Sequence, residues 1–296
     1  MTRPKAQMPR FARTTRGAIG LVIFAFVVGV ALFGPLLAPH GYATPIGPPG
    51  APPYGGAPLG TDYLGRDVLS RVLDGGLSVI WIGGAATLAS YLVGLTIGLV
   101  AGYSRTIVDP ILMRIVDVLL AFPALLLMLL FVGGLGAHVG VLILGVTLVQ
   151  LPGIARVMRT ATLEISTRGY VEAAVSRGER TSWVLTREIV PNIAPTLLAD
   201  LGVRFSYSII LVASMNYLGL GLQPPAPDWG VMIAENRSFV SLNVWSVLAP
   251  AVMLGLLTIG VNLIADAYVR TSTQSSVRAT RRRFIRQRVL RTTAAD

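Results

Sequence analysis

Side chains that carry out chemistry in enzymes are scarce in this sequence. The 296 residues include no cysteine, a single lysine, Lys5, and only two histidines, His40 and His138, which are far apart. A phosphate-binding loop needs a lysine after its glycines, a zinc protease needs two histidines four residues apart, and a serine hydrolase needs a histidine or lysine beside its serine. The sequence meets none of these requirements. We therefore expect a chain that is not an enzyme and that binds no cofactor or metal itself.

Four polar residues fall inside or at the ends of long apolar segments. They are Asp117, Asp200, Arg204 and Asn216. Charge is costly in hydrocarbon, so such groups are candidates for lining a path or closing a gate through a membrane. Asp200 and Arg204 are four residues apart and share a helix face, which favours a simple ion pair between them.

A short charged segment lies between these apolar stretches. Residues 169–178 read Gly-Tyr-Val-Glu-Ala-Ala-Val-Ser-Arg-Gly, and a Pro-Asn pair follows at 191–192. We expect a helix over 167–177, a left-handed stop at Gly178, and a second helix over 179–190 before Pro191 starts a membrane span.

The elements that must position these residues are membrane-spanning helices. Hydrophobic residues make up 53% of the chain and charged residues 13%, whereas soluble domains carry roughly 25% charged residues. A span needs about 20 apolar residues. The sequence predicts an all-α membrane protein of one membrane domain with six spans, at Ala18–Ala38, Val79–Gly102, Ile115–Leu135, Val139–Ala155, Pro195–Leu218 and Val244–Ala265.

Basic residues are distributed unequally between the two sets of alternating loops and tails. One set, which includes both termini and the charged segment, holds 21 of the 25 Lys and Arg residues, and the other set holds three. Basic residues accumulate on the cytoplasmic side, so both termini are expected there. The net charge of +11 is concentrated beside the spans, which favours contact with membrane lipid and argues against nucleic acid as a partner.

The segment after the first predicted span ends in a charged motif. Residues 59–71 read Leu-Gly-Thr-Asp-Tyr-Leu-Gly-Arg-Asp-Val-Leu-Ser-Arg, after a stretch rich in proline and glycine that predicts an extended loop. We expect an interfacial amphipathic helix here, with Val68, Leu69 and Val72 toward lipid and Asp67, Arg71 and Asp74 toward water.

A second motif follows the fifth predicted span. Residues 216–232 read Asn-Tyr-Leu-Gly-Leu-Gly-Leu-Gln-Pro-Pro-Ala-Pro-Asp-Trp-Gly-Val-Met. Gly219 and Gly221 are expected to end the helix, the prolines to fix a turn, and Trp229 to anchor at the level of the lipid headgroups. A structural turn without substrate contact is an equally good interpretation of this motif.

Together, the charged segment and these two motifs resemble the permease subunits of the dipeptide, oligopeptide and nickel family of binding-protein-dependent ABC importers. The resemblance implies a type I ABC importer permease fold with six transmembrane helices, in a bacterial inner membrane. It implies that the chain forms half of a translocation path for di- or oligopeptides. The implied partners are a paralogous second permease, two ATP-binding subunits or one fused ATPase that bind ATP and Mg, and an extracytoplasmic substrate-binding protein.

In the resembled family the charged segment is a cytoplasmic loop that docks on the ATPase, here called the coupling loop, residues 167–191. The resemblance implies these docking residues: Arg168, Tyr170, Glu172, Ala173, Ala174, Arg177, Gly178 and Pro191. The implied organisation is a basic cytoplasmic tail at 1–17, an anchor span at 18–38, an extracytoplasmic loop at 39–78, a transmembrane core at 79–270 and a second basic tail at 271–296.

Three alternatives remain open from the sequence. The coupling loop could be an amphipathic helix lying on the inner leaflet. The substrate could be nickel or another small solute. A secondary transporter that needs no ATPase is a third alternative, although that class predicts inverted repeats with interrupted helices, which are not evident.

Overall fold

The computed structural model describes residues 14–104 and 106–292, with side chains described as far as residue 271. Within this part of the chain, five helices are long and apolar enough to cross a membrane, and a bent pair would make a sixth crossing. Their bounds are Thr15–Leu37 (α1), Val68–Tyr103 (α2 and α3), Val139–Ser166 (α6), Thr181–Tyr217 (α8 to α9) and Trp245–Thr271 (within α11). The prediction of an all-α membrane protein is confirmed.

The third predicted span is not a single straight helix. The structure forms α4 (Val108–Leu120) and α5 (Ala124–Leu135), which meet at an angle of 85°. Pro123 lies at the break and cannot donate a backbone hydrogen bond, and a proline also disfavours helical geometry at the residue before it, Phe122. The predicted span Ile115–Leu135 is therefore wrong as one continuous element.

The helices α3 (Gly76–Tyr103) and α6 share the most extensive contact between two helices of the described bundle. Glycines recur every four residues along the contact face of α3, at 94, 98 and 102. A Cβ atom built on Gly98 would lie 2.6 Å from Met158 Cβ and 2.7 Å from the Ala155 carbonyl oxygen. Small residues at this spacing let two membrane helices approach closely, and here they bring the two backbones together.

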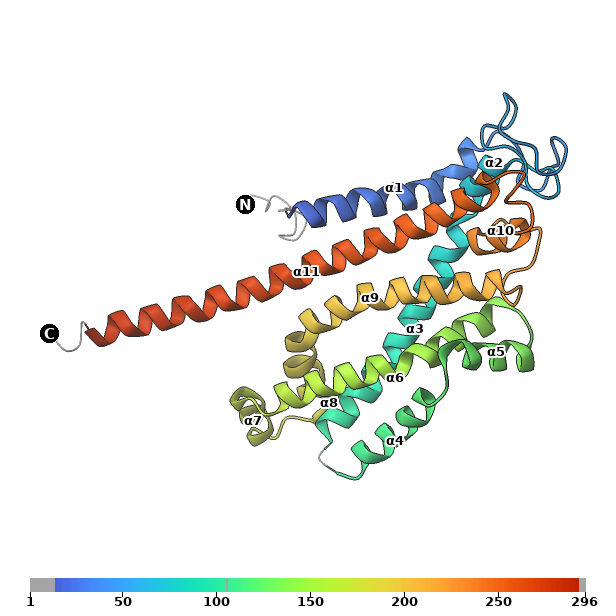
Figure 1. Cartoon of the computed structure of the whole chain (residues 1–296). Coiled ribbons are helices and arrows are strands. Elements are labelled where there is room, and N and C mark those ends of the chain that lie inside the picture. The colour runs from blue at the N-terminus through green and yellow to red at the C-terminus, as the bar shows by residue number, and fades with distance from the viewer. Residues whose placement is uncertain (1–13, 105, 293–296) are drawn as a thin grey trace.

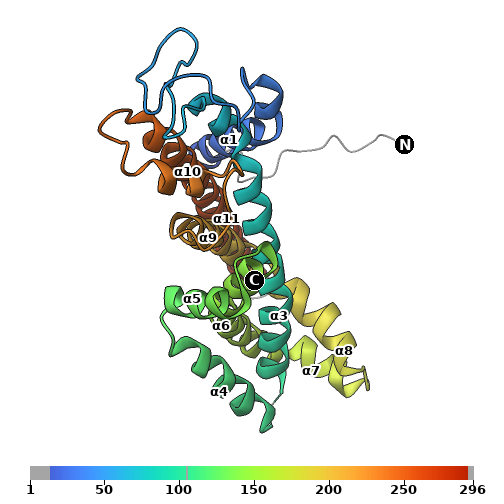
Figure 2. The same cartoon turned by 90° about the vertical axis from the view of Figure 1, so that its right-hand side faces the viewer.

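The elements gather at two ends of the bundle (Figure 1). One end holds the loop after α1, α2 (Val68–Asp74) and α10 (Trp229–Asn236), and we call it the α10 end. The other end holds α7 (Gly169–Ser176) and α8 (Thr181–Trp183), and we call it the α7 end. Figure 2, turned by 90°, shows α9 between α11 and α6.

Helices α1 and α11 (Trp245–Thr292) run side by side. Gly20 of α1 faces Gly260 of α11, and a Cβ on Gly20 would lie 3.0 Å from the Gly260 carbonyl oxygen. The helix α11 continues well past the end of the sixth predicted span. Residues 1–13 of the predicted N-terminal basic tail and the side chains of residues 272–296 in the predicted C-terminal basic tail lie outside the described residues.

Candidate coupling loop and membrane path

The helix α7 packs onto the chain through one face only. Val171 and Ala174, three residues apart, are buried against Val184, Ile189 and Ile193. Ala174 is 0% exposed. Of the two alanines that the resemblance implies as docking residues, Ala173 is exposed, whereas the side chain of Ala174 is covered by the chain's own core and is not available to a partner.

Gly178 ends α7 in the way that the sequence predicts. Its φ is +79°, in the left-handed region, and its N–H donates to the Val175 carbonyl at 2.9 Å. The N–H of Glu179 donates to the Ala174 carbonyl at 3.3 Å. These two bonds form a Schellman motif, which satisfies carbonyls at the end of the helix and turns the chain sharply.

The remaining predicted docking residues form an exposed surface on α7. Tyr170 is 42% exposed, and Glu172, Ala173 and Arg177 are exposed beside it. Arg168, just before the helix, donates from Nη2 to Glu164 Oε1 at 2.8 Å, in a pair that is open to solvent. The coupling loop thus presents a small exposed surface at the α7 end of the bundle, with charged side chains beside Tyr170 and Ala173.

Pro191 lies in the first turn of α9, as predicted, but no break separates this helix from the one before it. The helical run from Thr181 to Tyr217 is continuous, and it includes a π-helical stretch, η2 (Val184–Ile189), just before Pro191 in α9 (Val190–Tyr217). Because proline has no N–H, the carbonyl four residues earlier loses its helical donor, and a wider turn accommodates the gap. The second helix of the coupling loop and the membrane helix are therefore joined without a break in the helical backbone.

Asp200 and Arg204 form the ion pair that their spacing predicts. Arg204 Nε donates to Asp200 Oδ2 at 3.2 Å and to Oδ1 at 3.3 Å. Tyr91 of α3 donates its hydroxyl to the same Asp200 Oδ2 at 2.6 Å. Asp200 is thus held from two sides, and it fixes the direction of the Arg204 side chain.

Asp117 and Asn216, the other two candidates for the path, are not hydrogen-bonded to this pair in the described part of the chain. Asp117 Oδ1 accepts a hydrogen bond from Arg156 Nη2 at 2.6 Å, which ties α4 to α6. Asn216 is 1% exposed. Its Nδ2 donates to Asp228 Oδ1 at 2.8 Å, and its Oδ1 accepts from the Leu222 N–H at 2.9 Å. Asn216 therefore fastens the loop after α9, a position that differs from the one expected of a path residue.

The predicted helix forms, as α2 at Val68–Asp74, but its predicted interfacial orientation is wrong. Val68 is 0% exposed and packs in the core, while Arg71 is 0% exposed rather than directed to water. Arg71 Nη1 donates to Asp62 Oδ2 at 2.6 Å and to Glu235 Oε2 at 2.8 Å. Arg66 joins the same two carboxylates. A buried arginine needs such partners, and these link the loop after α1 to α10.

Trp229 is also buried, at 0% exposed, and is not a headgroup anchor. Its indole Nε1 donates to the Val72 carbonyl at 2.9 Å. Asp228, the N-cap of α10, accepts from the Gly230 N–H at 2.8 Å and from the Ser78 hydroxyl at 2.6 Å. Burial raises the pKa of Asp228 above its ordinary value. The glycine turn before it matches the prediction at Gly219, whose φ is +73°, whereas Gly221 lies tightly against Asn216.

One face of α9 is exposed along its whole length and carries polar side chains at membrane depth. Exposed or half-exposed positions recur every three or four residues: Thr196, Asp200, Val203, Tyr207, Ile210, Ser214 and Tyr217. Five of these seven side chains are polar, whereas every exposed side chain of α1 from Ala18 to Leu37 is apolar. Polar groups inside a membrane face a cavity or another protein segment, and apolar ones face lipid. The face of α9 is thus the candidate wall of a path.

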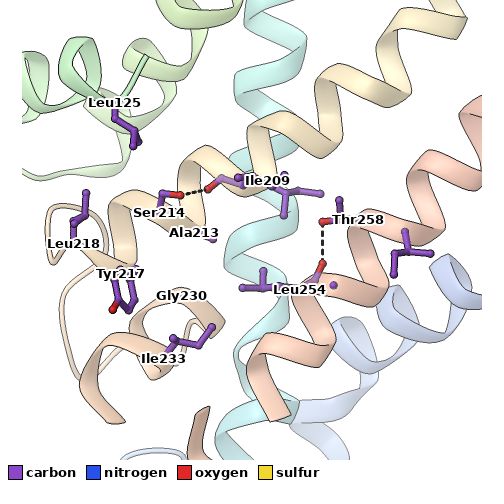
Figure 3. Close-up of a pocket in the computed structure, with 13 residues that line it drawn as sticks. Leu125, Ile209, Ala213, Ser214, Tyr217, Leu218, Gly230, Ile233, Leu254 and Thr258 are labelled. Atoms are coloured by element: carbon purple, nitrogen blue, oxygen red, sulfur yellow. Dashed lines mark hydrogen bonds between the residues drawn. The ribbon is translucent and has the colours of Figure 1, made fainter. Parts of the chain in front are cut away.

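An open pocket of about 600 Å³ hollows this face between α9, α10 and α11 (Figure 3). The serine and threonine hydroxyls on its wall are turned back to their own helices. Ser214 Oγ donates to the Ile210 carbonyl at 2.7 Å, and Thr258 Oγ1 donates to the Leu254 carbonyl at 2.9 Å. The surface of the pocket is therefore almost entirely apolar.

A helical membrane bundle with a rigid elbow at one end and a polar face at depth has the architecture of a multi-pass transport subunit. Residues 94–274 match the family model described as the binding-protein-dependent transport system inner membrane component. Residues 8–53 match the N-terminal TM domain of oligopeptide transport permease C. This chain belongs to the family of binding-protein-dependent transport permeases, whose members are not themselves catalytic, and the sequence resemblance is confirmed.

Several characterised proteins are similar over most of the chain. The di/tripeptide transport system permease protein DppC of Pseudomonas aeruginosa is 34% identical over 259 residues, covering 85% of this chain and 86% of that protein. The glutathione transport system permease protein GsiD of Pectobacterium atrosepticum is 36% identical over 208 residues, covering 70% of this chain and 69% of that protein.

Solved structures support the type I importer permease fold. A chain of the MetNI methionine ABC transporter, in an inward-facing conformation, superposes with a TM-score of 0.57 at 19% identity, covering 68% of this chain and 95% of that one. A chain of an amino acid ABC transporter gives a TM-score of 0.51 at 17% identity, covering 68% and 94%.

Proposed function

We propose that this chain is the permease subunit of an ATP-driven importer of di- or oligopeptides and forms half of its translocation path. The observation that carries the proposal is the continuity of the helix from Thr181 to Tyr217. The base of this helix packs against α7, and its exposed polar face is the candidate wall of the path. A displacement of α7 by an ATPase would therefore move the path wall directly.

The relatives support a peptide as the substrate, because several of them are named as dipeptide or di/tripeptide permeases. The partners in this proposal are a paralogous second permease that faces α9 across the path, and two ATP-binding subunits or one fused ATPase that dock on α7. An extracytoplasmic substrate-binding protein delivers the peptide at the α10 end. ATP and Mg bind to the ATPase, and this chain binds no cofactor.

The proposed contact with the ATPase consists of the exposed residues of the coupling loop: Arg168, Tyr170, Glu172, Ala173 and Arg177. Gly178 and the helical run through Pro191 hold that surface in place. Asp200 and Arg204 are proposed to line the path, because both take part in a pocket on the exposed face of α9.

The test is to co-express the chain with the other subunits of its own transport system, measure the mass of the detergent-extracted complex, and assay uptake in vesicles. The expected result is a complex of two different permeases and two ATPase domains that takes up dipeptides only with ATP and loaded binding protein. A lone monomer that supports ATP-driven uptake would overturn the proposal.

We place the protein in the bacterial inner membrane with both termini and the coupling loop in the cytoplasm, on the basis of the charge asymmetry. The chain has no cysteine, so single cysteines report topology cleanly. Gly55, where a side chain would meet nothing within 4 Å, and exposed Ser238 are suitable sites at the α10 end. Spheroplasts, in which the inner membrane is intact and its outer face is accessible, are treated with a membrane-impermeant thiol reagent. The reagent should label Gly55→Cys and Ser238→Cys but not Ser176→Cys. The opposite pattern would invert the topology.

A further inference from the structure

A second, polar pocket of about 380 Å³ adjoins the apolar one on the same face of α9. The two pockets share Ile210 as a wall residue. The polar pocket is lined by Asp200, Val203, Arg204, Ser206, Tyr207, Ile210 and Asn262. Arg204 precedes the end of α9 at Tyr217 by 13 residues, so it lies about 20 Å deeper, past the middle of a bilayer.

Arg204 is held so that its outer nitrogens are free. Its Nε is engaged by Asp200, but in the described part of the chain neither Nη1 nor Nη2 has a hydrogen-bond acceptor. These nitrogens lie over Gly153 of α6, where an added Cβ would be 2.5 Å from Nη1 and 2.7 Å from Nη2. Glycine at 153 therefore makes the room that the guanidinium occupies.

The other open groups of the pocket are also hydrogen-bond donors. Ser206 Oγ donates to Asn262 Oδ1 at 3.2 Å, and the Asn262 Nδ2 amide has no hydrogen-bond acceptor in the described part of the chain. The phenol of Tyr207 is exposed beside it. The one carboxylate of the pocket, Asp200, already accepts from Arg204 and from Tyr91. The pocket thus offers hydrogen-bond donors without an acceptor and the positively charged guanidinium of Arg204. Its one carboxylate, that of Asp200, already accepts hydrogen bonds from within the chain.

We propose that this pocket binds a carboxylate of the substrate, and that Arg204 is the residue that holds it. A guanidinium with two parallel free N–H groups matches the two oxygens of a carboxylate, and the match is strong away from bulk water. The inference rests on the proposed function, since it requires that the face of α9 lines the path. In a peptide the group that is always available is the C-terminal carboxylate, and we assign the pocket to it. The peptide would cross the apolar pocket first and then place its carboxylate on Arg204.

The test uses Val203→Cys, because Val203 lines the pocket, is 53% exposed and offers no hydrogen bond that the substitution would remove. The complete complex, with cysteine-free partners and without nucleotide or binding protein, is treated with a small thiol reagent. The probes are the dipeptide Ala-Ala, its C-terminal amide, and Ala-Asp with an amidated C-terminus. Ala-Ala should slow the labelling of the cysteine, and both amides should need at least tenfold higher concentration.

Substitutions of Arg204 test whether this residue is responsible for the protection, and a substitution of Arg237 is the control. Arg204→Gln should abolish protection by Ala-Ala, Arg204→Lys should retain part of it, and Arg237→Gln at the exposed α10 end should leave it unchanged. Equal protection by Ala-Ala and its amide, in the complex with Arg204 intact, overturns the inference and needs no variant that folds poorly. Protection by the Asp-bearing amide equal to that by Ala-Ala overturns the assignment to the C-terminus. Failure of the native complex to take up dipeptides would instead refute the proposed function.

Discussion

Replacement of Gly178 isolates the contribution of one backbone conformation to coupling. The residue has a φ of +79°, and a Cβ at this position would meet nothing within 4 Å. A side chain therefore causes no collision, and the whole cost is that of the left-handed conformation, about 1–2 kcal/mol for an ordinary residue. A cost of this size reduces the population of the native turn by roughly 5- to 30-fold.

This reasoning predicts an order of effects that does not follow side-chain size. Asparagine tolerates the left-handed region, so Gly178→Asn should be the mildest change, Gly178→Ala intermediate, and β-branched Gly178→Val the most severe. The measurements are hydrogen exchange at the Gly178 and Glu179 amides, which close the Schellman motif, and retention of the ATPase during purification. The reasoning is refuted if Gly178→Ala is milder than Gly178→Asn, so that the loss increases in the order Ala, Asn, Val, because that order follows side-chain volume and would point to a collision at this site.

Three further changes test other parts of the account. Gly98→Val should lower thermal stability in detergent by about 1–3 kcal/mol, because its Cβ would meet Met158 and a backbone oxygen, while Gly29→Ala in open space should be neutral. Asp228→Ala should lower the free energy of unfolding by about 2–4 kcal/mol, because it removes the cap of α10 and leaves the buried Asn216 amide unpaired. Asp228→Asn should lose less, because it keeps the cap without a buried charge, and equal losses for the two variants would contradict this. Glu172→Ala should weaken ATPase binding several-fold and Asp266→Ala, at an exposed carboxylate of α11, should not, which pull-down of the ATPase measures.

Local sequence was sufficient to predict those features of the structure that neighbouring residues determine. Gly178 and Gly219 each follow a helical pattern, and both adopt the positive φ that ends a helix. Asp200 and Arg204 pair because a helix places residues four apart on one side. The spans were located by hydropathy, since nothing else in the chain is apolar over such lengths.

Features set by distant parts of the chain could not be predicted in this way. The burial of Arg71 depends on Asp62 and on Glu235, which is 164 residues away. Ala174 faces inward only because the helix after the turn folds back over it. The break between α4 and α5, in contrast, could have been predicted from the local sequence, because Pro123 disfavours a continuous helix. The mean hydropathy of the segment does not show it.

The central claim is that the ATPase docks on α7 while the opposite end of the bundle meets the binding protein. Tyr170 of α7 and Tyr54 of the loop after α1 make a matched pair, since each is 42% exposed. A photo-crosslinking phenylalanine analogue is placed at either position in the assembled complex. The account predicts that the probe at position 170 crosslinks to the ATPase and the probe at position 54 crosslinks only to the binding protein. Crosslinks from position 54 to the ATPase, or none from position 170, would contradict it.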